Sequence, residues 1–365
     1  MLEELTMAEN KSIQRQYHLD YLRVFASIAI ILLHVTAQNM RYVELAGTEW
    51  NIYNICNGAT RWGVPVFVMM SGALFLPREI PTKTLYKKYI SRMAISYVVW
   101  SAFYAIVDSV GNLIFTEGYQ VSGIEIIGSF ISGAIHLWFL PMIIGLYMCI
   151  PLIKQLTQND KLIKYFLLLS FIFWFCKTQV SLIANNLLSG NVQEILENVT
   201  TLSGNFSINL VTGFVTYFIL GFYLNKTEIS KKHRTIIYFL GVAGLVLTIL
   251  LNLLASKNAD KSLEVFYGAS TINVLFMSVA MFVWFKYNAK GTEKLNKLII
   301  HLSKYSFGAF LVHIFVLQCL KAVGIQSTSF HPVLSVPTIT IFTTIVSYLI
   351  SMVLNKIPVI KKYIV

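Results

Sequence analysis

The chain has 365 residues, of which 56% are hydrophobic and only 13% are charged, and its mean hydropathy is +0.65. Soluble domains usually carry about 25% charged residues, so this composition excludes an ordinary soluble protein and predicts an integral membrane protein. The apolar runs are long enough for helices, whereas a membrane β-barrel would show alternating segments of about ten residues. The formal charge of +12 does not indicate nucleic-acid binding, because no soluble segment with a basic face is evident.

Ten windows of about twenty apolar residues predict membrane spans. They lie near residues 20–39, 56–76, 93–115, 136–153, 162–183, 206–224, 236–255, 267–285, 305–324 and 336–354. We therefore expect an all-α fold, a polytopic membrane helix bundle of about ten transmembrane helices, built as one domain over residues 1–365. Residues 19–355 would form the bundle, with cytoplasmic tails at 1–18 and 356–365. No small-residue cleavage site precedes the first span, which is expected to be a retained signal anchor.

The positive charges predict the orientation. Of the 29 Lys and Arg residues, all lie on or beside one set of alternate connections except Arg41, Arg61, Lys177, Lys257, Lys261 and Lys321. Because Lys and Arg collect in cytoplasmic loops, both termini are predicted to face the cytoplasm from a multi-pass plasma or inner cell membrane. An even number of spans follows. The four cysteines lack CxxC spacing and histidine partners, so they are expected to be inert thiols, and no metal site is predicted.

The first span, LDYLRVFASIAIILLHVTAQ, contains ionisable residues, which cost roughly 2.5–3.5 kcal/mol each in a bilayer on insertion scales. At about 100° per residue, the steps from Arg23 to His34 leave an offset of only about 20° over a climb of roughly 16 Å. Five polar residues share a stripe about 60° wide. They are Asp20, Arg23, Ser27, His34 and Gln38. The stripe is expected to face a bundle interior or a wet cavity.

Several interpretations of these residues stay open. Arg23 is either a snorkelling anchor near the cytoplasmic surface or part of a site. His34 lies too deep to snorkel, so it is either a hydrogen-bonded structural histidine or a group that takes up protons near neutral pH. Further polar candidates for the interior are Arg61, His136, Trp138 and His313. Their simpler interpretations are an ion pair for Arg61, an interfacial position for His136 and a bond to a neighbouring carbonyl for His313.

The segment LDYLRVFASIAIILLH resembles the first-helix signature of the membrane acyltransferase 3 family, in which Arg is followed by ten residues and His, after an Asp-x-x-Arg pattern. VPVFVMMSGALFL, HLWFLPMIIGLYMCIPL and YSFGAFLVHIFVL resemble three further blocks of that family in the same order. The similarity extends from residue 18 to about residue 355. It implies an integral membrane O-acyltransferase that moves acyl groups, commonly acetyl from acetyl-CoA, onto hydroxyls of cell-surface or lipid-linked saccharides.

The resemblance also implies residue roles. His34 would be the catalytic histidine, with Arg23 and Asp20 as its partners in the motif. The family often has Arg-x-x-Arg after the second span, whereas this sequence has Tyr89-Ile-Ser-Arg92, so Lys88 and Arg92 are the candidates for donor binding. An acyl-CoA is implied as co-substrate, with no bound cofactor. Members with a fused extracytoplasmic domain exist, and without one transfer is expected to finish in the membrane domain or with a partner.

Other functions stay open as well. A transporter or flippase for a lipid-linked sugar would also need many spans and a polar interior, although the sequence shows no inverted repeat or interrupted helix. A succinyl donor in polysaccharide export is a further alternative, and a sensor or structural protein would not need Arg23 and His34 on one face. Transfer needs a base for the acceptor hydroxyl or an acyl-His34 intermediate, and the sequence does not choose between them. It does not predict the oligomeric state either.

The orientation can be tested by reporter fusions at the N-terminus and at residue 365. Both reporters should give the cytoplasmic signal, because the basic connections flank the odd-numbered spans on their N-terminal side. A reporter inserted in the acidic connection 184–205 serves as the control and should give the opposite signal. An extracytoplasmic signal at either terminus would contradict the orientation.

Overall fold

A computed structural model of the protein describes residues 16–365, and within this range the chain is helical with no strand, as the sequence predicts. Most of the expected tail 1–18, including Lys11 and Arg15, lies outside the described residues. The main helices are α2 (Tyr17–Ala37), α3 (Thr48–Gly58), α4 (Gly63–Phe75), α6 (Ser91–Phe115), α7 (Gly123–Ser132), α8 (Phe139–Met148), α9 (Ile150–Thr157), α10 (Asp160–Ser170), α11 (Lys177–Leu187), α12 (Asn191–Asn205), α13 (Val215–Lys226), α14 (Lys231–Asn258), α15 (Ile272–Asn288), α16 (Glu293–Ala322), α17 (Pro332–Leu354) and α18 (Pro358–Tyr363). The short α5 (Thr82–Thr84) and a π-helical turn (Leu85–Ile90) precede α6, and a second π-helical turn (Phe171–Cys176) joins α10 to α11.

Seven of the described segments are long and apolar enough to cross a membrane. They correspond to the predicted spans near 20–39, 93–115, 162–183, 236–255, 267–285, 305–324 and 336–354. An eighth crossing is available if α8 and α9, which meet at an angle of 62°, count as one broken span. The predicted spans near 56–76 and 206–224 fall on shorter helices, so the count of ten stays a prediction.

Two of the predicted spans are interrupted, contrary to the expectation of continuous helices. Pro65, in the first turn of α4, has no N–H to bond the carbonyl of Arg61, which removes a helical hydrogen bond at the break between α3 and α4. Pro151 has the same effect at the junction of α8 and α9, where it cannot bond the carbonyl of Tyr147. The sequence shows both prolines, but it does not show that the chain breaks rather than kinks there.

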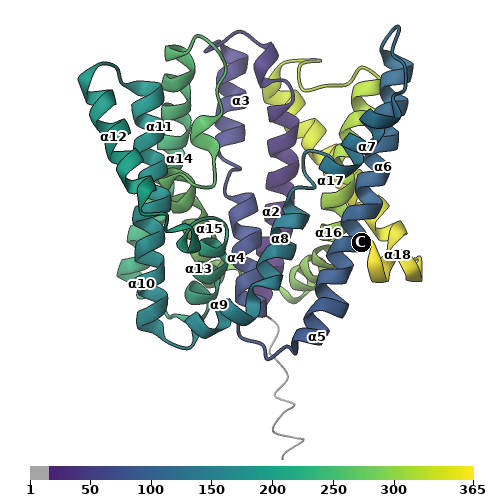
Figure 1. Ribbon diagram of the computed structural model, residues 1–365. Coiled ribbons are helices and arrows are strands. Elements are labelled where there is room, and N and C mark those ends of the chain that lie inside the picture. Colours follow the sequence, from purple (N-terminus) through teal and green to yellow (C-terminus); the bar gives the residue numbers. More distant parts are fainter. Residues whose placement is uncertain (1–15) are drawn as a thin grey trace, which may run out of the picture.

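Helix α2 lies at the centre of the bundle and packs against α3, α4, α15, α16 and α17 (Figure 1). The apolar window of the span that begins with α2 is 67% buried, and that of α16 is 61% buried. The span of α10 and α11 is only 17% buried and lies at the periphery. The polar stripe of α2 therefore faces other helices, as expected for ionisable groups in an apolar bundle.

The connections gather at two opposite ends. Ion pairs join those predicted to be cytoplasmic: Lys154–Glu79 (2.6 Å), Lys226–Asp160 (2.5 Å) and Lys286–Glu228 (3.8 Å). At the other end Arg41 and Arg61 both pair with Glu264 (3.4 and 3.2 Å), and Asn39 donates to Ser327 (2.8 Å). The grouping agrees with the alternation of charge in the sequence. The side of the membrane on which each end lies stays a prediction.

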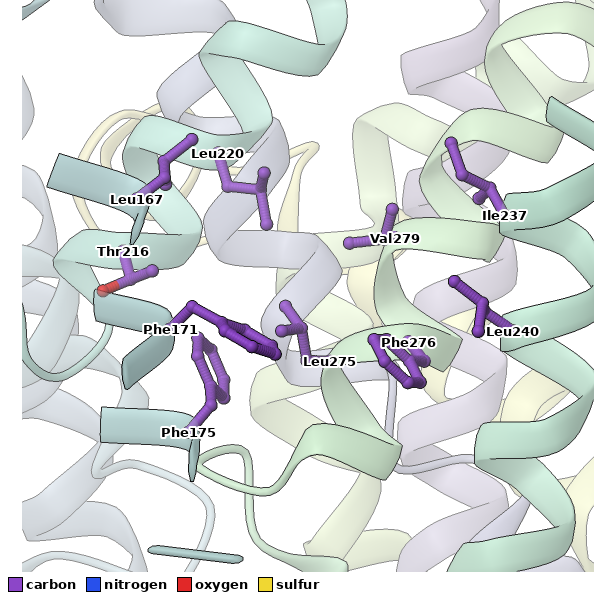
Figure 2. A pocket seen from close by; sticks show the side chains of 10 residues that line it. All are labelled: Leu167, Phe171, Phe175, Thr216, Leu220, Ile237, Leu240, Leu275, Phe276 and Val279. Atoms are coloured by element: carbon purple, nitrogen blue, oxygen red, sulfur yellow. The ribbon is translucent and has the colours of Figure 1, made fainter. Parts of the chain in front are cut away.

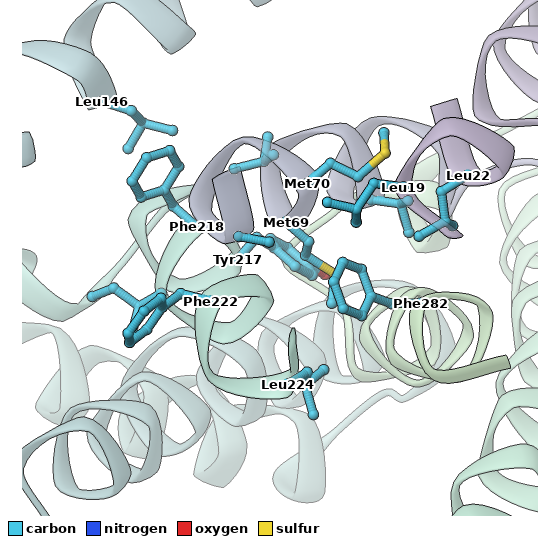
Figure 3. Packing of buried hydrophobic residues seen from close by; sticks show 14 of the residues in the cluster. Leu19, Leu22, Met69, Met70, Leu146, Tyr217, Phe218, Phe222, Leu224 and Phe282 are labelled. Atoms are coloured by element: carbon cyan, nitrogen blue, oxygen red, sulfur yellow. The ribbon is translucent and has the colours of Figure 1, made fainter. Parts of the chain in front are cut away.

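The crossing of α4 and α13 depends on two glycines. A Cβ atom on Gly72 would collide with the backbone of Phe218, and one on Gly221 would collide with the backbone of Met69. Around this contact, Met69, Phe218 and Phe282 fill the space between the helices (Figure 3). Small residues allow close backbone approach, which is how helices associate inside a membrane.

We therefore expect Gly72→Ala and Gly221→Ala to destabilise the bundle, since overpacking typically costs about 1–3 kcal/mol. The measurement is the midpoint of thermal unfolding in detergent, followed by size-exclusion chromatography. Gly145→Ala in α8 is the matched control, because nothing lies within 4 Å of a Cβ added there. Equal midpoints for all three variants would contradict the close-packed crossing.

Candidate active site

The inner half of the α2 stripe is tied to α16 and α17. Ser303 on α16 donates to the Asp20 carboxylate (2.7 Å), and the Arg23 guanidinium donates to Ser303 (3.4 Å). One turn further on, the hydroxyls of Ser27 and Tyr348 lie 2.7 Å apart. Asp20 and Ser27 are buried, and Arg23 is partly buried. Arg23 is therefore held inside the bundle, and the alternative of a freely snorkelling anchor does not fit.

The outer half of the stripe ends in a cluster of three histidines. The ring centroids of His34 and His313 lie 5.1 Å apart, and those of His136 and His313 also lie 5.1 Å apart. His136 and His313 are 2% and 0% exposed, whereas His34 is only partly buried. Three separate segments, α2, the turn before α8, and α16, thus bring one imidazole each to the same place.

Backbone carbonyls of α16 hold the two buried rings. His313 Nδ1 lies 2.5 Å from the Phe310 oxygen, and His136 Nε2 lies 3.2 Å from the Leu311 oxygen. The Tyr104 hydroxyl of α6 enters the same turn, donating to the Leu311 oxygen (2.8 Å) and accepting from the Phe315 amide (3.1 Å). The alternative predicted for His313, a bond to a nearby carbonyl, is confirmed. His136 is buried among the helices, so it does not face the lipid.

His34 lines a cavity of about 920 Å³ at the outer end of α2. Its charged and polar lining includes Gln38, Arg41, Glu44, Glu49, Glu264, Gln318 and Lys321. The cavity mixes both signs of charge with amide groups, which is a suitable surface for a polyhydroxyl ligand. His34 is the only histidine in this lining among the residues that the structure describes.

Arg23 lines a second cavity, of about 180 Å³, closer to the inner end. Ser71 and Tyr147 add hydroxyl groups, and Ile30 lies one turn before His34 on the same helix. Phe310 also lines this cavity and stacks on the other side against His136 and His313, with ring centroids 5.5 and 5.8 Å apart. The histidine cluster therefore lies between the two cavities, and Phe310 forms part of the partition.

A third pocket, of about 260 Å³, lies between α10, α13, α14 and α15 (Figure 2). Its lining is aliphatic and aromatic, with Thr216 as the one hydroxyl. Without a titratable side chain it offers no acid, base or nucleophile. The chemistry of this chain is therefore to be sought along α2.

The remaining predicted residues are spread out. Arg61 pairs with Glu264 and lies over the Tyr267 ring (4.2 Å), which confirms its simpler interpretation as an ion-pair partner. Gln38 is exposed and faces the outer cavity. Trp138 is 45% exposed and stacks on Phe139 and Phe214, away from the histidines.

The two residues predicted to bind the donor have different surroundings. Lys88 is exposed, with its ammonium 5.4 Å from the centre of the Tyr89 ring. Arg92 is partly buried and donates to the backbone oxygen of Val365 (2.5 Å), while its guanidinium lies 5.9 Å from the Phe307 ring that lines the inner cavity. The segment 356–365 was expected to be a free tail, but α18 packs against α6. Only Arg92 thus lies next to the inner cavity.

Sequence reasoning missed several residues of the site. Two of them bond to the α2 stripe: Ser303 to Asp20 and Tyr348 to Ser27. Tyr104 bonds to the Leu311 carbonyl beside the histidine cluster, and Phe310 separates the cavities. The block YSFGAFLVHIFVL contains Phe310 beside His313, but no spacing rule relates it to a helix almost 300 positions earlier. Hydroxyls inside apolar spans were the one available signal, and they are too common to single out these three.

The fold and the site together define a membrane protein with a buried basic group, a histidine cluster and two cavities that approach it from opposite ends. A family model described as an acyltransferase domain matches residues 16–352. The chain therefore belongs to the acyltransferase 3 family, as the sequence resemblance predicts, and this membership implies a membrane acyltransferase. No curated protein and no solved structure matches the chain. Within residues 16–365, no group of three or more His, Cys, Asp or Glu side chains is arranged to hold a metal ion.

Substitution of Arg23 tests whether the inner cavity holds the donor. Arg23→Lys keeps the charge but loses the planar guanidinium, whose several N–H groups can donate to Ser303 and to a ligand at the same time. Loss of one hydrogen bond to a charged group costs about 1.5–3 kcal/mol, so the KM for acetyl-CoA should rise by about 10-fold or more. Arg41→Lys, at the exposed edge of the outer cavity, is the control and should leave this KM unchanged. An unchanged KM in Arg23→Lys would make Arg23 a structural residue.

Proposed function

We propose that this protein transfers an acyl group, acetyl in the first instance, from acyl-CoA to a hydroxyl of a cell-surface or lipid-linked saccharide. The observation that carries the proposal is the position of His34. It borders the outer cavity and contacts the buried His313, while Arg23, on the same face of α2, borders the inner cavity. One helix face thus links a basic inner site to a proton acceptor at the outer site.

The inner end of α2 offers contacts for the donor's phosphates, although its cavity of about 180 Å³ holds only part of a CoA molecule. Arg23 offers a guanidinium, which pairs well with phosphate groups, and Arg92 lies near the same cavity. The climb of roughly 16 Å from Arg23 to His34 excludes Arg23 from direct contact with a carbonyl that reacts at His34. A CoA whose phosphates bind at the inner end would place its thioester at the far end of its flexible arm, toward the histidines.

The outer cavity suits the acceptor. Its volume of about 920 Å³ is within the usual range for ligand sites. Carboxylates at Glu44, Glu49 and Glu264 alternate with cationic Arg41 and Lys321, so the lining has both donors and acceptors for sugar hydroxyls. This balanced charge favours a neutral saccharide over a strongly anionic one.

The transfer balances with His34 as a general base. The acceptor hydroxyl oxygen attacks the thioester carbonyl carbon while His34 takes the hydroxyl proton. Collapse of the tetrahedral intermediate breaks the carbon–sulfur bond, and the proton on His34 passes to the leaving thiolate. The products are the acyl ester and free CoA thiol.

The alternative route uses His34 as a nucleophile. A ring nitrogen of His34 attacks the thioester carbonyl carbon, the carbon–sulfur bond breaks, and the other ring nitrogen gives its proton to the leaving thiolate, so that CoA leaves as the thiol. The acceptor hydroxyl then attacks the acyl-imidazole, its proton returns to the imidazole, and the acyl ester is released. The partition at Phe310 favours this two-stage route, because donor and acceptor would occupy different cavities. To distinguish the routes, the protein is incubated with acetyl-CoA labelled in the acetyl group, without acceptor, and the reaction is quenched. Label that stays on the wild-type protein and is absent from His34→Ala indicates the acyl-enzyme.

Transport of a lipid-linked sugar is the second candidate. The interruptions between α3 and α4 and between α8 and α9 favour it, since broken helices are typical of transporter binding sites. It differs from acyl transfer in one measurable respect, because a transporter releases no thiol from acetyl-CoA.

The test of the proposal is His34→Ala in purified protein and in cells. Thiol release from acetyl-CoA should fall by at least about 10²-fold, the usual loss for a general base, with insertion and expression unchanged. His301→Ala, at an exposed position of α16, is the matched control and should keep full activity. Mass spectrometry of envelope saccharides from the same cells identifies the acceptor. A His34→Ala protein with wild-type activity would exclude His34 from the chemistry.

A further inference from the structure

His313 lies in the second half of α16 and is fully buried. Its Nδ1 bonds to the Phe310 carbonyl oxygen (2.5 Å). A carbonyl oxygen can only accept, so Nδ1 carries the ring proton and, in the neutral imidazole, Nε2 presents a lone pair. The backbone of α16 therefore fixes the tautomer of His313.

The lone pair of His313 lacks a donor. Within the described residues, Nε2 is buried and has no hydrogen-bond partner. Unpaired polar atoms of this kind are rare inside proteins, and each calls for an explanation. No metal ion explains it, because the three histidines of the cluster do not form a metal-binding group. A donor from a neighbouring side chain, either N–H or O–H, is the remaining protein partner.

In the described part of the chain, His34 and His136 are the two polar rings in contact with His313, and Tyr104 lies next to them against His136; of these three, only His34 has a donor that is not already used. His136 uses its Nε2 proton on the Leu311 oxygen, which leaves its own Nδ1 as a second buried lone pair without a partner. Tyr104 donates to the same Leu311 oxygen. His34 has no such commitment to a carbonyl of α16, and its ring lies 5.1 Å from that of His313. Two imidazoles joined by an N–H···N bond of about 2.9 Å have centroids about 5 Å apart.

We propose that His313 is the positioning residue of His34: its Nε2 accepts the N–H of His34, so that the other ring nitrogen of His34 is unprotonated and faces the outer cavity. The proposal rests on the proposed acyl transfer at His34. The two rings are tilted by 46° and are not hydrogen-bonded in this structure, so the bond forms by rotation about χ2 of histidine, which is a soft torsion. A third group that fixes the tautomer of the base is a general feature of activated bases and nucleophiles.

A neutral imidazole suits this role inside a membrane better than a carboxylate does. A buried carboxylate is costly unless it is fully paired. His313 accepts the same N–H without adding a charge, and it can stabilise the imidazolium that forms when His34 takes the proton. His136 packs edge-on against it (76°) and Phe310 covers it from the inner side, so the ring is held on two sides.

The experiment compares His313→Gln with His313→Phe, using thiol release from acetyl-CoA by the purified full-length protein. The amide oxygen of Gln can accept the N–H of His34, whereas Phe fills the space and cannot. We expect kcat to fall by about 10²-fold or more in His313→Phe and by less than about 10-fold in His313→Gln, with the KM for acetyl-CoA nearly unchanged in both. In a His34→Ala background, His313→Phe should cause no further loss, because the two residues act as a unit.

Tyr217→Phe is the control for loss of a buried polar group, because Tyr217 is equally buried and donates to a backbone carbonyl, that of Ala269 (2.7 Å), but lines neither the inner nor the outer cavity. It should keep kcat within about 10-fold of wild type. Equal losses in His313→Phe, His313→Gln and Tyr217→Phe would reduce His313 to packing and overturn the proposal, as would full activity in His313→Phe. If wild type releases no thiol at all, the proposed function fails first, independently of His313.

If His313→Phe does not insert, ¹⁵N spectra of the wild-type protein decide. With labelled histidine, the His34 signals are identified by their loss in His34→Ala. A single tautomer with one hydrogen-bonded N–H supports the proposal. A mixture of both tautomers overturns it.

Discussion

The cost of placing charged groups among apolar helices governs this structure. Asp20 and Arg23 lie in the span with the greatest burial, where an unpaired charge would be prohibitive. Ser303 joins the two side chains, and Ser27 bonds to Tyr348, so three helices must meet along one face of α2. The central place of α2 follows from this requirement, because only a helix surrounded by others can hide such a stripe.

Charge is distributed unevenly along that face. Asp20 and Arg23 mark the inner end, and the cluster of Arg41, Arg61 and Glu264 marks the outer end. Between them the polar groups are hydroxyls and imidazoles fixed by backbone carbonyls. The middle of the bundle is thus polar without being charged, which keeps the insertion cost low and still provides groups that can exchange protons.

Much of the fold could be predicted from the sequence, and the reason is physical. Helical period and apolar run length are local properties, so the all-α class, the seven long spans and the shared face of Arg23 and His34 are readable from one segment at a time. The grouping of the connections into a basic set and a less basic set is readable as well, because Lys and Arg collect in alternate connections, whereas the side of the membrane on which each set lies stays a prediction.

What could not be predicted depends on contacts between distant segments. Neither Pro65 nor Pro151 reveals by itself whether a span kinks or breaks, because neighbouring helices decide how the freed carbonyl is satisfied. The meeting of His34, His136 and His313 requires three helices to be placed to within a few ångströms. The docking of α18 on α6, which engages Arg92 through the Val365 oxygen, has no local signal at all.

The histidine cluster has different surroundings on the sides of the inner and the outer cavity. Phe310 closes the inner cavity below His136 and His313, while His34 alone of the three borders the outer cavity. A proton or an acyl group on His34 is therefore exposed toward the outer side and shielded from the inner one by aromatic rings. These rings separate a group on His34 from water in the inner cavity, so hydrolysis is limited further only when the acceptor fills the outer cavity and displaces its water. In the proposed reaction the thioester must pass Phe310 to reach His34. The packing of Phe310 therefore affects both how fast the acyl group reaches His34 and how much of it is transferred to the acceptor instead of to water.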